Sequence, residues 1–164
     1  MAAAIASRLG IPHLELDSVF HQPNWAGLPT EEFVARVAEF TEQLAWVVDG
    51  NYTSHGITDV VWDRADTVVW LDLPRSEAMR RVVRRTLRRI RDREDLWNGN
   101  RERWTNLLDP RPEGNIILWT WTRFAEVGEK YGRRFADDRW AHVARIRLRT
   151  PAEVEAFVDS LPSG

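Results

Sequence analysis

The sequence predicts an α/β fold with three layers and a mostly parallel sheet. Apolar, β-branched segments alternate along the chain with segments of helical periodicity, which is the order found in such folds. Residues 67–72 (TVVWLD) are apolar up to the final aspartate, as expected for a strand buried on both faces of a parallel sheet. Three predicted strands end at or run directly into an aspartate, namely Asp17, Asp49 and Asp72. Because ligands bind at the carboxyl ends of parallel strands, these positions also predict a site.

The first half of the chain is expected to contain two helices and two strands. Residues 2–9 are helix formers followed by Gly10, and a short strand should follow at residues 13–16. Residues 17–28 are expected to be loop. Thr30 is a suitable N-cap for a helix with apolar positions from Phe33 to Leu44. Residues 45–49 form the second expected strand, and residues 51–65 are expected to be loop or irregular helix.

The second half is expected to contain three helices and two strands. After the strand at residues 67–72, Pro74 opens a long helix with arginines on its outer face. Residues 92–114 are polar and predict a loop-rich, lid-like segment, and residues 115–135 are expected to be helical. Residues 143–148 alternate as a fourth strand. Thr150, Pro151 and Glu153 form a capping box that begins a last helix.

Composition indicates one globular domain spanning residues 1–164. The apolar fraction is 43% and the charged fraction is 29%, as in soluble proteins. Cysteine is absent, which excludes disulfides and thiolate metal sites and fits a cytoplasmic protein. No apolar run approaches the ~20 residues of a membrane helix, and the first residues lack the pattern of a signal peptide. Most of the nine tryptophans are expected to be packing residues.

An arginine-rich helix is the most pronounced chemical feature of the sequence. Nearby acids cannot neutralise all of these arginines, so the helix predicts a surface for polyanions such as nucleotide phosphates or a nucleic acid backbone. About half of the arginines are expected to form an ordinary solvated helix face. The nine are Arg75, Arg80, Arg81, Arg84, Arg85, Arg88, Arg89, Arg91 and Arg93.

Two aspartates and one polar turn are the other candidates for a site. Asp49 follows a hydrophobic strand and precedes Gly50, so it is placed to hold Mg²⁺ while the glycine lets a phosphate approach. Asp17 is placed to bind an acceptor substrate or its metal. Taken alone, Asp49 is better explained as a turn residue after a strand, whereas Asp17 is equally compatible with an N-cap or turn residue. Residues 96–102 (LWNGNRE) predict either a mobile lid or an ordinary surface turn.

These segments together resemble the adenylate-kinase-like P-loop family, and in particular its bacterial DNA topology modulation protein branch. The most specific matches are residues 23–25 (PNW) and residues 45–52 (AWVVDGNY). Residues 13–17 (HLELD), 64–75 (RADTVVWLDLPR) and 96–102 also match. The resemblance extends over nearly the whole chain, from Ala2 to Leu161.

The resemblance implies ATP-dependent phosphoryl transfer with ATP and Mg²⁺ as cofactors. Asp49 would be the Walker B aspartate in the magnesium shell. Three residues, Asp17, Asn51 and Tyr52, would face a nucleotide or another small phosphoryl acceptor. The helix arginines Arg81 and Arg85 would contact the base and phosphates of ATP, and Arg101 would be a lid arginine.

The sequence departs from this family at its beginning. No G-x-x-x-x-G-K-[ST] motif occurs, so the amides, lysine and hydroxyl that hold ATP phosphates are missing. The family's central strand, between the strands that end at Asp49 and Asp72, is missing as well. We therefore expect an inactive chain that folds poorly alone, and a natural protein longer by about 25 residues.

Two other hypotheses remain at this point. The arginine-rich helix is compatible with a nucleic-acid-binding protein, although the net charge of −2 argues against it. The second hypothesis is a truncated pseudoenzyme that is stabilised by a partner supplying the missing strand.

Overall fold

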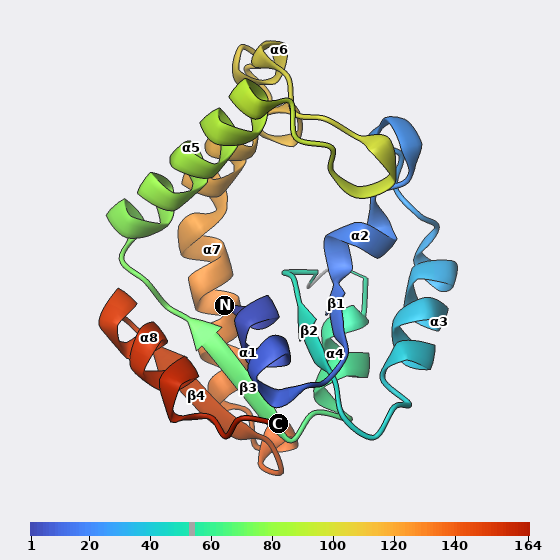
Figure 1. Cartoon of the computed structure of the whole chain (residues 1–164), viewed down its shortest axis with the longest axis vertical. Coiled ribbons are helices and arrows are strands. Elements are labelled where there is room, and N and C mark those ends of the chain that lie inside the picture. Colours follow the sequence, from blue (N-terminus) through green and yellow to red (C-terminus); the bar gives the residue numbers. More distant parts are fainter. Residues whose placement is uncertain (53–54) are drawn as a thin grey trace.

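The computed structural model describes residues 1–52 and 55–164, and it contains two separate parallel sheets. Strand β1 (His13–Glu15) pairs with β2 (Val47–Asp49), and β3 (Thr67–Leu71) pairs with β4 (Ala144–Leu148). All four strands point the same way, and β2 and β3 are the inner pair (Figure 1). Among the described residues no hydrogen-bonded ladder joins β2 to β3. A continuous three-layer sheet therefore stays a prediction.

The β1–β2 sheet is packed against short helices. These are α1 (Ala2–Leu9), α2 (Leu16–Phe20), α3 (Thr30–Phe40) and α4 (Ile57–Trp62). Helix α1 contacts β1, β2 and α8, so it lies next to both sheets. The apolar core of this part consists of Leu16, Leu28, Phe33, Val37 and Ile57.

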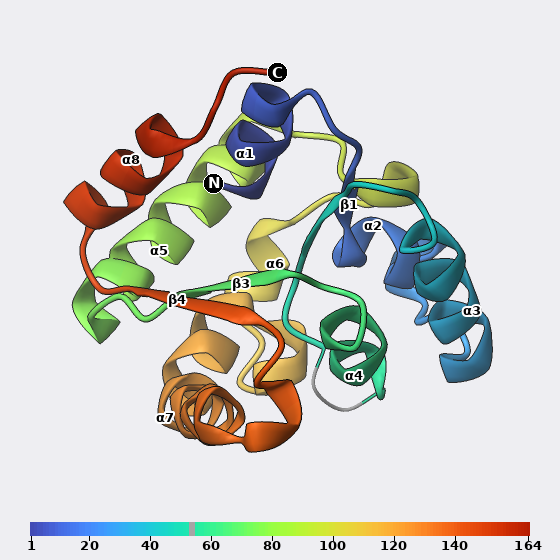
Figure 2. The same ribbon diagram turned by 90° about the horizontal axis from the view of Figure 1, so that it is seen from below.

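The β3–β4 sheet is covered by helices on both faces. Helix α8 (Pro151–Ser160) lies on one face together with α1, and α7 (Ile116–Ala136) lies on the other (Figure 2). Helix α5 (Arg75–Asp92) leaves the end of β3 and packs on α7. A second core of Trp62, Trp140 and Val143 joins α4 to the C-terminal end of α7. The two cores are separate clusters of buried side chains.

The segment at residues 92–114 contains three short helical turns and is docked on the chain near residue 22. The turns are η2 (Trp97–Gly99), α6 (Trp104–Leu107) and η3 (Pro112–Gly114). Asn100 is 4% exposed. Its side-chain Nδ2 donates to the Gln22 main-chain carbonyl at 2.9 Å, and its Oδ1 accepts from the Trp25 main-chain N–H at 2.9 Å. Trp25 belongs to the turn η1 (Pro23–Trp25). Hydrogen bonds therefore join the η1 and η2 regions, which are far apart in sequence.

Several predictions of local structure need correction. Residues 17–20, predicted as loop, belong to α2 because the chain turns directly after Glu15. Thr30 is the first residue of α3 and makes no cap, since Pro29 is the N-cap. At α8 the Thr150 hydroxyl does accept from the Glu153 amide at 3.1 Å. The Glu153 carboxylate, however, accepts from the Arg149 amide rather than from the Thr150 amide, so the box is displaced by one residue.

Most of the tryptophans are buried or half-buried, as expected for packing residues. Trp62 and Trp140 are buried, at 4% and 1% exposure. Trp104 and Trp121 are more than half exposed, at 58% and 52%, which places them outside both cores. Within the described residues, none of the helices has the length and apolar character that crossing a membrane requires.

An ion-pair cluster ties α4 to the end of α7. The Asp59 carboxylate accepts from Arg134 at 2.7 Å and from Arg139 at 3.2 Å. The hydrogen bond from Arg134 is the main reason why the pKa of Asp59 lies below its usual value of 3.8. The folded chain binds a proton at Asp59 less readily than the unfolded chain. The pair therefore stabilises the fold at pH values above 3.8, and this stabilisation is lost as the pH falls through the lowered pKa of Asp59.

The cluster predicts a pH-dependent effect of Asp59→Asn. We expect a loss of at most about 1 kcal/mol of unfolding free energy near neutral pH, because the pair is partly exposed. The loss should shrink as the pH falls through the lowered pKa of Asp59. Urea unfolding at about pH 7 and about pH 3 measures it. An equal loss at both pH values would contradict the electrostatic explanation.

Candidate functional site

Acidic side chains meet where β1 and β2 end. The register places Glu15 directly opposite Asp49, and Asp17 follows in the first turn of α2. His13 Nε2 lies 3.5 Å from Asp49 Oδ2. Parallel pairing therefore brings together groups that are 34 residues or so apart in the sequence, at the edge where ligands bind in such sheets.

The pKa of Asp49 is raised above its usual value. Burial is the largest cause, and the nearby carboxylates of Glu15 and Asp17 add to it, while His13 opposes it. A cation placed among these carboxylates would relieve their repulsion. The donor set is suited to Mg²⁺ held by Asp49 through water, because carboxylate oxygen is the ligand that this ion prefers. Within residues 1–52 and 55–164 no group of three His, Asp or Glu side chains forms a metal site by itself.

Asp17 and Tyr52 form the most direct contact between predicted site residues. The Tyr52 hydroxyl donates to Asp17 Oδ1 at 2.6 Å, and His21 Nε2 lies 3.9 Å from the same oxygen. Burial, followed by the contact with Asp17, raises the pKa of Tyr52. Burial also lowers the pKa of His21, so its ring is largely neutral beside Asp17 at neutral pH. The Asp17 carboxylate is thereby held in a fixed orientation, with its remaining lone pairs available to a ligand.

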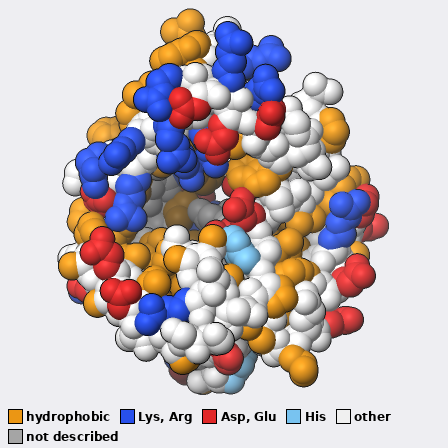
Figure 3. Space-filling view, viewed as in Figure 1, with side chains coloured by type: hydrophobic (Ala, Val, Ile, Leu, Met, Phe, Trp, Pro, Cys, Tyr) orange, Lys and Arg blue, Asp and Glu red, His pale blue; other side chains and the backbone are white. Residues whose placement is uncertain are grey.

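Arg85 lies close enough to Asp17 for the two charges to interact. The space-filling view shows arginines gathered around a central depression, with acidic and histidine side chains on the opposite rim (Figure 3). The pKa of Arg85 is lowered, mainly by partial removal from water and then by Arg89, while Glu102 and Asp17 oppose this shift. Arg85 keeps contact with solvent and makes neither an ion pair nor a hydrogen bond within the described residues. A cation in this setting is free to bind an anionic group.

Most other arginines of α5 are paired with acids. Glu77 accepts from Arg80 and Arg81 at 2.9 and 2.6 Å, and these bonds lower its pKa to about 2. Arg88 lies 3.9 Å from Glu94, and Arg91 donates to Asp92 at 2.7 Å. Within the described residues, the α5 arginines whose side chains make neither an ion pair nor a hydrogen bond are Arg84 and Arg85, and the side chain of the C-cap residue Arg93 makes neither.

Trp97 connects the docked turn to the acidic edge, which sequence reasoning did not predict. Its indole N–H donates to Glu15 Oε2 at 2.8 Å, and its ring stacks on His21 with centroids 5.8 Å apart. Arg89 lies over the same ring at 5.5 Å and approaches Glu102 at 3.3 Å. The sequence marked this turn as a candidate lid, but its partners come from a segment about 80 residues away.

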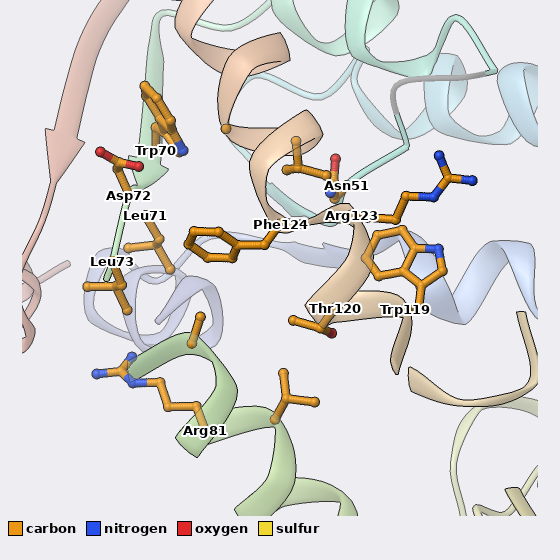
Figure 4. A pocket seen from close by; sticks show the side chains of 14 residues that line it. Asn51, Trp70, Leu71, Asp72, Leu73, Arg81, Trp119, Thr120, Arg123 and Phe124 are labelled. Carbon is orange, nitrogen blue, oxygen red and sulfur yellow. The ribbon is translucent and has the colours of Figure 1, made fainter. Parts of the chain in front are cut away.

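Three of the predicted site residues lie away from Asp17. Arg101 is paired with Asp95 at 2.5 Å, and both side chains are exposed. Asn51 accepts from Tyr131 at 3.2 Å and lines a cavity of about 320 Å³ between β3, α5 and α7. Arg81 lines the same cavity (Figure 4). The cavity walls are mainly apolar, and neither Asp17 nor Tyr52 lines them.

Gly50 is required by the packing of its surroundings. Its φ of 140° is a conformation that residues with side chains rarely adopt. A Cβ atom there would lie 2.7 Å from the Cβ of Leu16. The Leu16 side chain therefore occupies the space that any larger residue at position 50 would need.

Comparisons of the chain with protein-family models, with curated proteins and with solved structures find no match. The family resemblance therefore stays a hypothesis, and function has to be inferred from the site.

Proposed function

We propose that the site around Asp17 and Arg85 serves the transfer of the γ-phosphoryl group of ATP–Mg²⁺ to a nucleotide or another small acceptor, once groups that cradle the donor phosphates are supplied. The single observation that supports this most is Arg85, whose side chain makes no ion pair or hydrogen bond within the described residues and whose charge interacts with that of Asp17, the partner of Tyr52. Phosphoryl transfer needs positive charge around the moving group and an oriented acceptor beside it. Arg85 provides the first feature and the fixed Asp17 carboxylate provides the second.

Each residue has a distinct task in this proposal. Asp49 holds Mg²⁺ through water, and the ion neutralises charge on the phosphates. Arg85 contacts the phosphate oxygens, where its planar group forms paired hydrogen bonds. Asp17 accepts a hydrogen bond from the acceptor hydroxyl while Tyr52 keeps its carboxylate in place. The sequence contains no motif for cradling the donor phosphates, so we expect no ATP turnover by these residues alone.

A nucleic-acid role receives less support from the arginine-rich helix. Five of its arginines lie beside Glu77, Asp92, Glu94 or Glu102, which lowers the net positive charge of the surface. Binding driven by phosphate contacts requires such charge to be free and weakens steeply with salt. A localised anion site at Arg85 needs only one or two free cations.

Calorimetric titration with AMP and ADP, with and without Mg²⁺, tests the proposal. Arg85→Gln should weaken nucleotide binding by about tenfold or more, because a charge-assisted contact is lost. Arg91→Gln is the matched control, since Arg91 is on the same helix, is exposed and is paired with Asp92. We expect its affinity to equal that of the unchanged chain.

Two outcomes would contradict the proposal. One is equal affinity of the Arg85 and Arg91 variants, and the other is failure of the unchanged chain to bind either nucleotide. Turnover of labelled ATP by the unchanged chain would contradict only the expectation that it is inactive. A steep salt dependence of binding to a single-stranded oligonucleotide, with no nucleotide binding, would favour the nucleic-acid hypothesis instead.

A further inference from the structure

Three large apolar side chains are exposed at one end of the molecule. Leu108 is 82% exposed, Trp104 58% and Ile116 38%. They belong to α6, its C-cap and the first turn of α7, and Figure 1 shows α6 at the upper end of the long axis. Trp104 and Leu108 are four residues apart, so they lie on one face of the helical turn. We call these three residues the apolar tip, and such a group on the surface indicates contact with another surface.

Buried hydrogen bonds fix the position of the apolar tip. Asn115 is 9% exposed, and its Oδ1 accepts from two main-chain N–H groups in the first turn of α7 at 3.1 and 3.2 Å. Its Nδ2 donates to the main-chain carbonyls of Leu107 and Asp109 at 3.1 and 3.3 Å. One side chain therefore joins the end of α6 to the start of α7, and the exposure of the apolar tip follows from this link.

The segment that carries the apolar tip is the positively charged part of the chain. Residues 75–116 contain twelve arginines and seven acidic residues, a net charge of +5. The rest of the chain contains eleven basic and eighteen acidic residues, a net charge of −7. Figure 3 shows cationic and hydrophobic side chains close together at the upper end of the molecule. This end is therefore complementary to a negatively charged surface.

Unpaired arginines flank the apolar tip. Arg103 directly precedes α6, and Arg93 is the C-cap of α5. Within the described residues neither side chain forms an ion pair. Two acids of the same segment, Asp95 and Asp109, are paired with arginines at 2.5 and 2.8 Å. The two free cations can therefore bind anionic groups outside the protein.

We propose that the apolar tip docks on an anionic lipid membrane, with its side chains among the lipid headgroups and Arg93 and Arg103 against the negative charges. A stable protein interface takes about 800 Å² from each partner, more than three side chains at the end of a molecule provide. A lipid surface has no such requirement, because affinity is the sum of apolar burial and attraction to anionic lipids. Tryptophan is also typical of the membrane–water boundary. This inference does not depend on phosphoryl transfer.

Co-sedimentation of the whole chain with vesicles tests the inference. One set of vesicles consists of phosphatidylcholine, and in the other phosphatidylserine replaces part of it. We expect at least about tenfold tighter binding to the second set, because cations near an anionic surface add to the affinity. This difference should shrink as salt is added. Equal binding to both sets, or binding to neither, would overturn the inference.

A pair of leucine variants tests the contribution of the apolar tip. Leu108→Glu should weaken binding to the anionic vesicles by at least about tenfold, because it removes apolar burial and adds a negative charge. Leu44→Glu is the matched control, since Leu44 is fully exposed and follows α3 in the other part of the molecule. Both variants change exposed side chains, so both should fold. Equal affinities of the two variants would overturn the inference.

A second pair of variants tests the flanking charge. Arg103→Gln should weaken binding to the anionic vesicles about fivefold, the effect of one cation near the surface. Arg36→Gln is the matched control, because Arg36 is exposed and paired with Glu32 on α3. We expect Arg36→Gln to bind as the unchanged chain does. An equal effect of the two substitutions would contradict docking through this end.

Quenching by brominated lipids tests which residue enters the membrane. Anionic vesicles with bromine on their acyl chains should quench part of the tryptophan emission of the unchanged chain. Trp104→Leu keeps an apolar side chain, so it should still bind but lose most of this quenching. Undiminished quenching in this variant would overturn the inference. Self-association that Leu108→Glu abolishes, without vesicle binding, would also overturn it and would identify the apolar tip as a contact between copies of the chain.

Discussion

Replacing Trp140 by alanine is expected to lower the free energy of unfolding by about 3–5 kcal/mol, the cost of removing a large buried aromatic side chain. Trp140 is 1% exposed and packs edge-on against Trp62, with ring centroids 5.4 Å apart. Arg139 covers its ring at 4.4 Å. The variant would leave a cavity in the core that joins α4 to α7 and to the β3–β4 sheet.

Urea unfolding followed by circular dichroism measures this effect. Trp104→Ala is the matched control, because Trp104 is 58% exposed and lies outside both cores. We expect the control to change stability by less than about 0.5 kcal/mol. A loss at Trp140 no larger than at Trp104 would show that the second core does not hold the fold together.

Gly50→Ala is expected to cost about 2–5 kcal/mol and to disturb the candidate site. The alanine Cβ would meet the Leu16 side chain at 2.7 Å, and the φ of 140° is unfavourable for alanine in any surroundings. Leu16 is 4% exposed in the first core and cannot move without displacing its neighbours. Because Asp17 follows Leu16 and Asp49 precedes Gly50, relief of the clash should alter the spacing of the two carboxylates.

Gly128→Ala provides the matched control for this substitution. Gly128 lies in α7, and a Cβ there would have no heavy atom within 4 Å. We expect this variant to be about 0.5–1 kcal/mol more stable than the unchanged chain, since alanine favours the helix. Thermal unfolding and AMP titration of both variants give the comparison. If Gly50→Ala leaves both the stability and the AMP affinity unchanged, the turn after β2 can adjust to a side chain at this position.

Local sequence patterns predicted most of the secondary structure. The helices that begin after Met1, Pro74, Asn115 and Thr150 are close to their expected positions, because each has an apolar face of helical period next to a capping or breaking residue. Prediction failed at residues 17–20, which together with Leu16 form the five-residue helix α2. A helix that short depends on its packing against α3 and not on its own propensities.

The candidate site was only partly accessible from the sequence. The structure brings Asp17 and Tyr52 into contact and places Arg85 within electrostatic reach of Asp17, but it leaves Arg101 in an exposed pair with Asp95. Arg101 belongs to a turn, where a long side chain can reach several acidic residues. The sequence alone does not determine which of these residues it pairs with. Trp97 was recognisable as part of a polar turn, yet its partner Glu15 is 82 residues away.

By itself, the sequence determined the alternation of strands and helices, the aspartate after β2, the arginine stripe on α5 and the missing phosphate-loop motif. These features depend on residues that are neighbours along the chain, where periodicity and capping act. Only the tertiary structure decided which arginine stays free, that Gly50 makes room for Leu16, and that β2 and β3 each keep one open edge. Such outcomes depend on packing and on pairing between distant segments, because each side chain and each strand edge has several possible partners until the whole chain is folded.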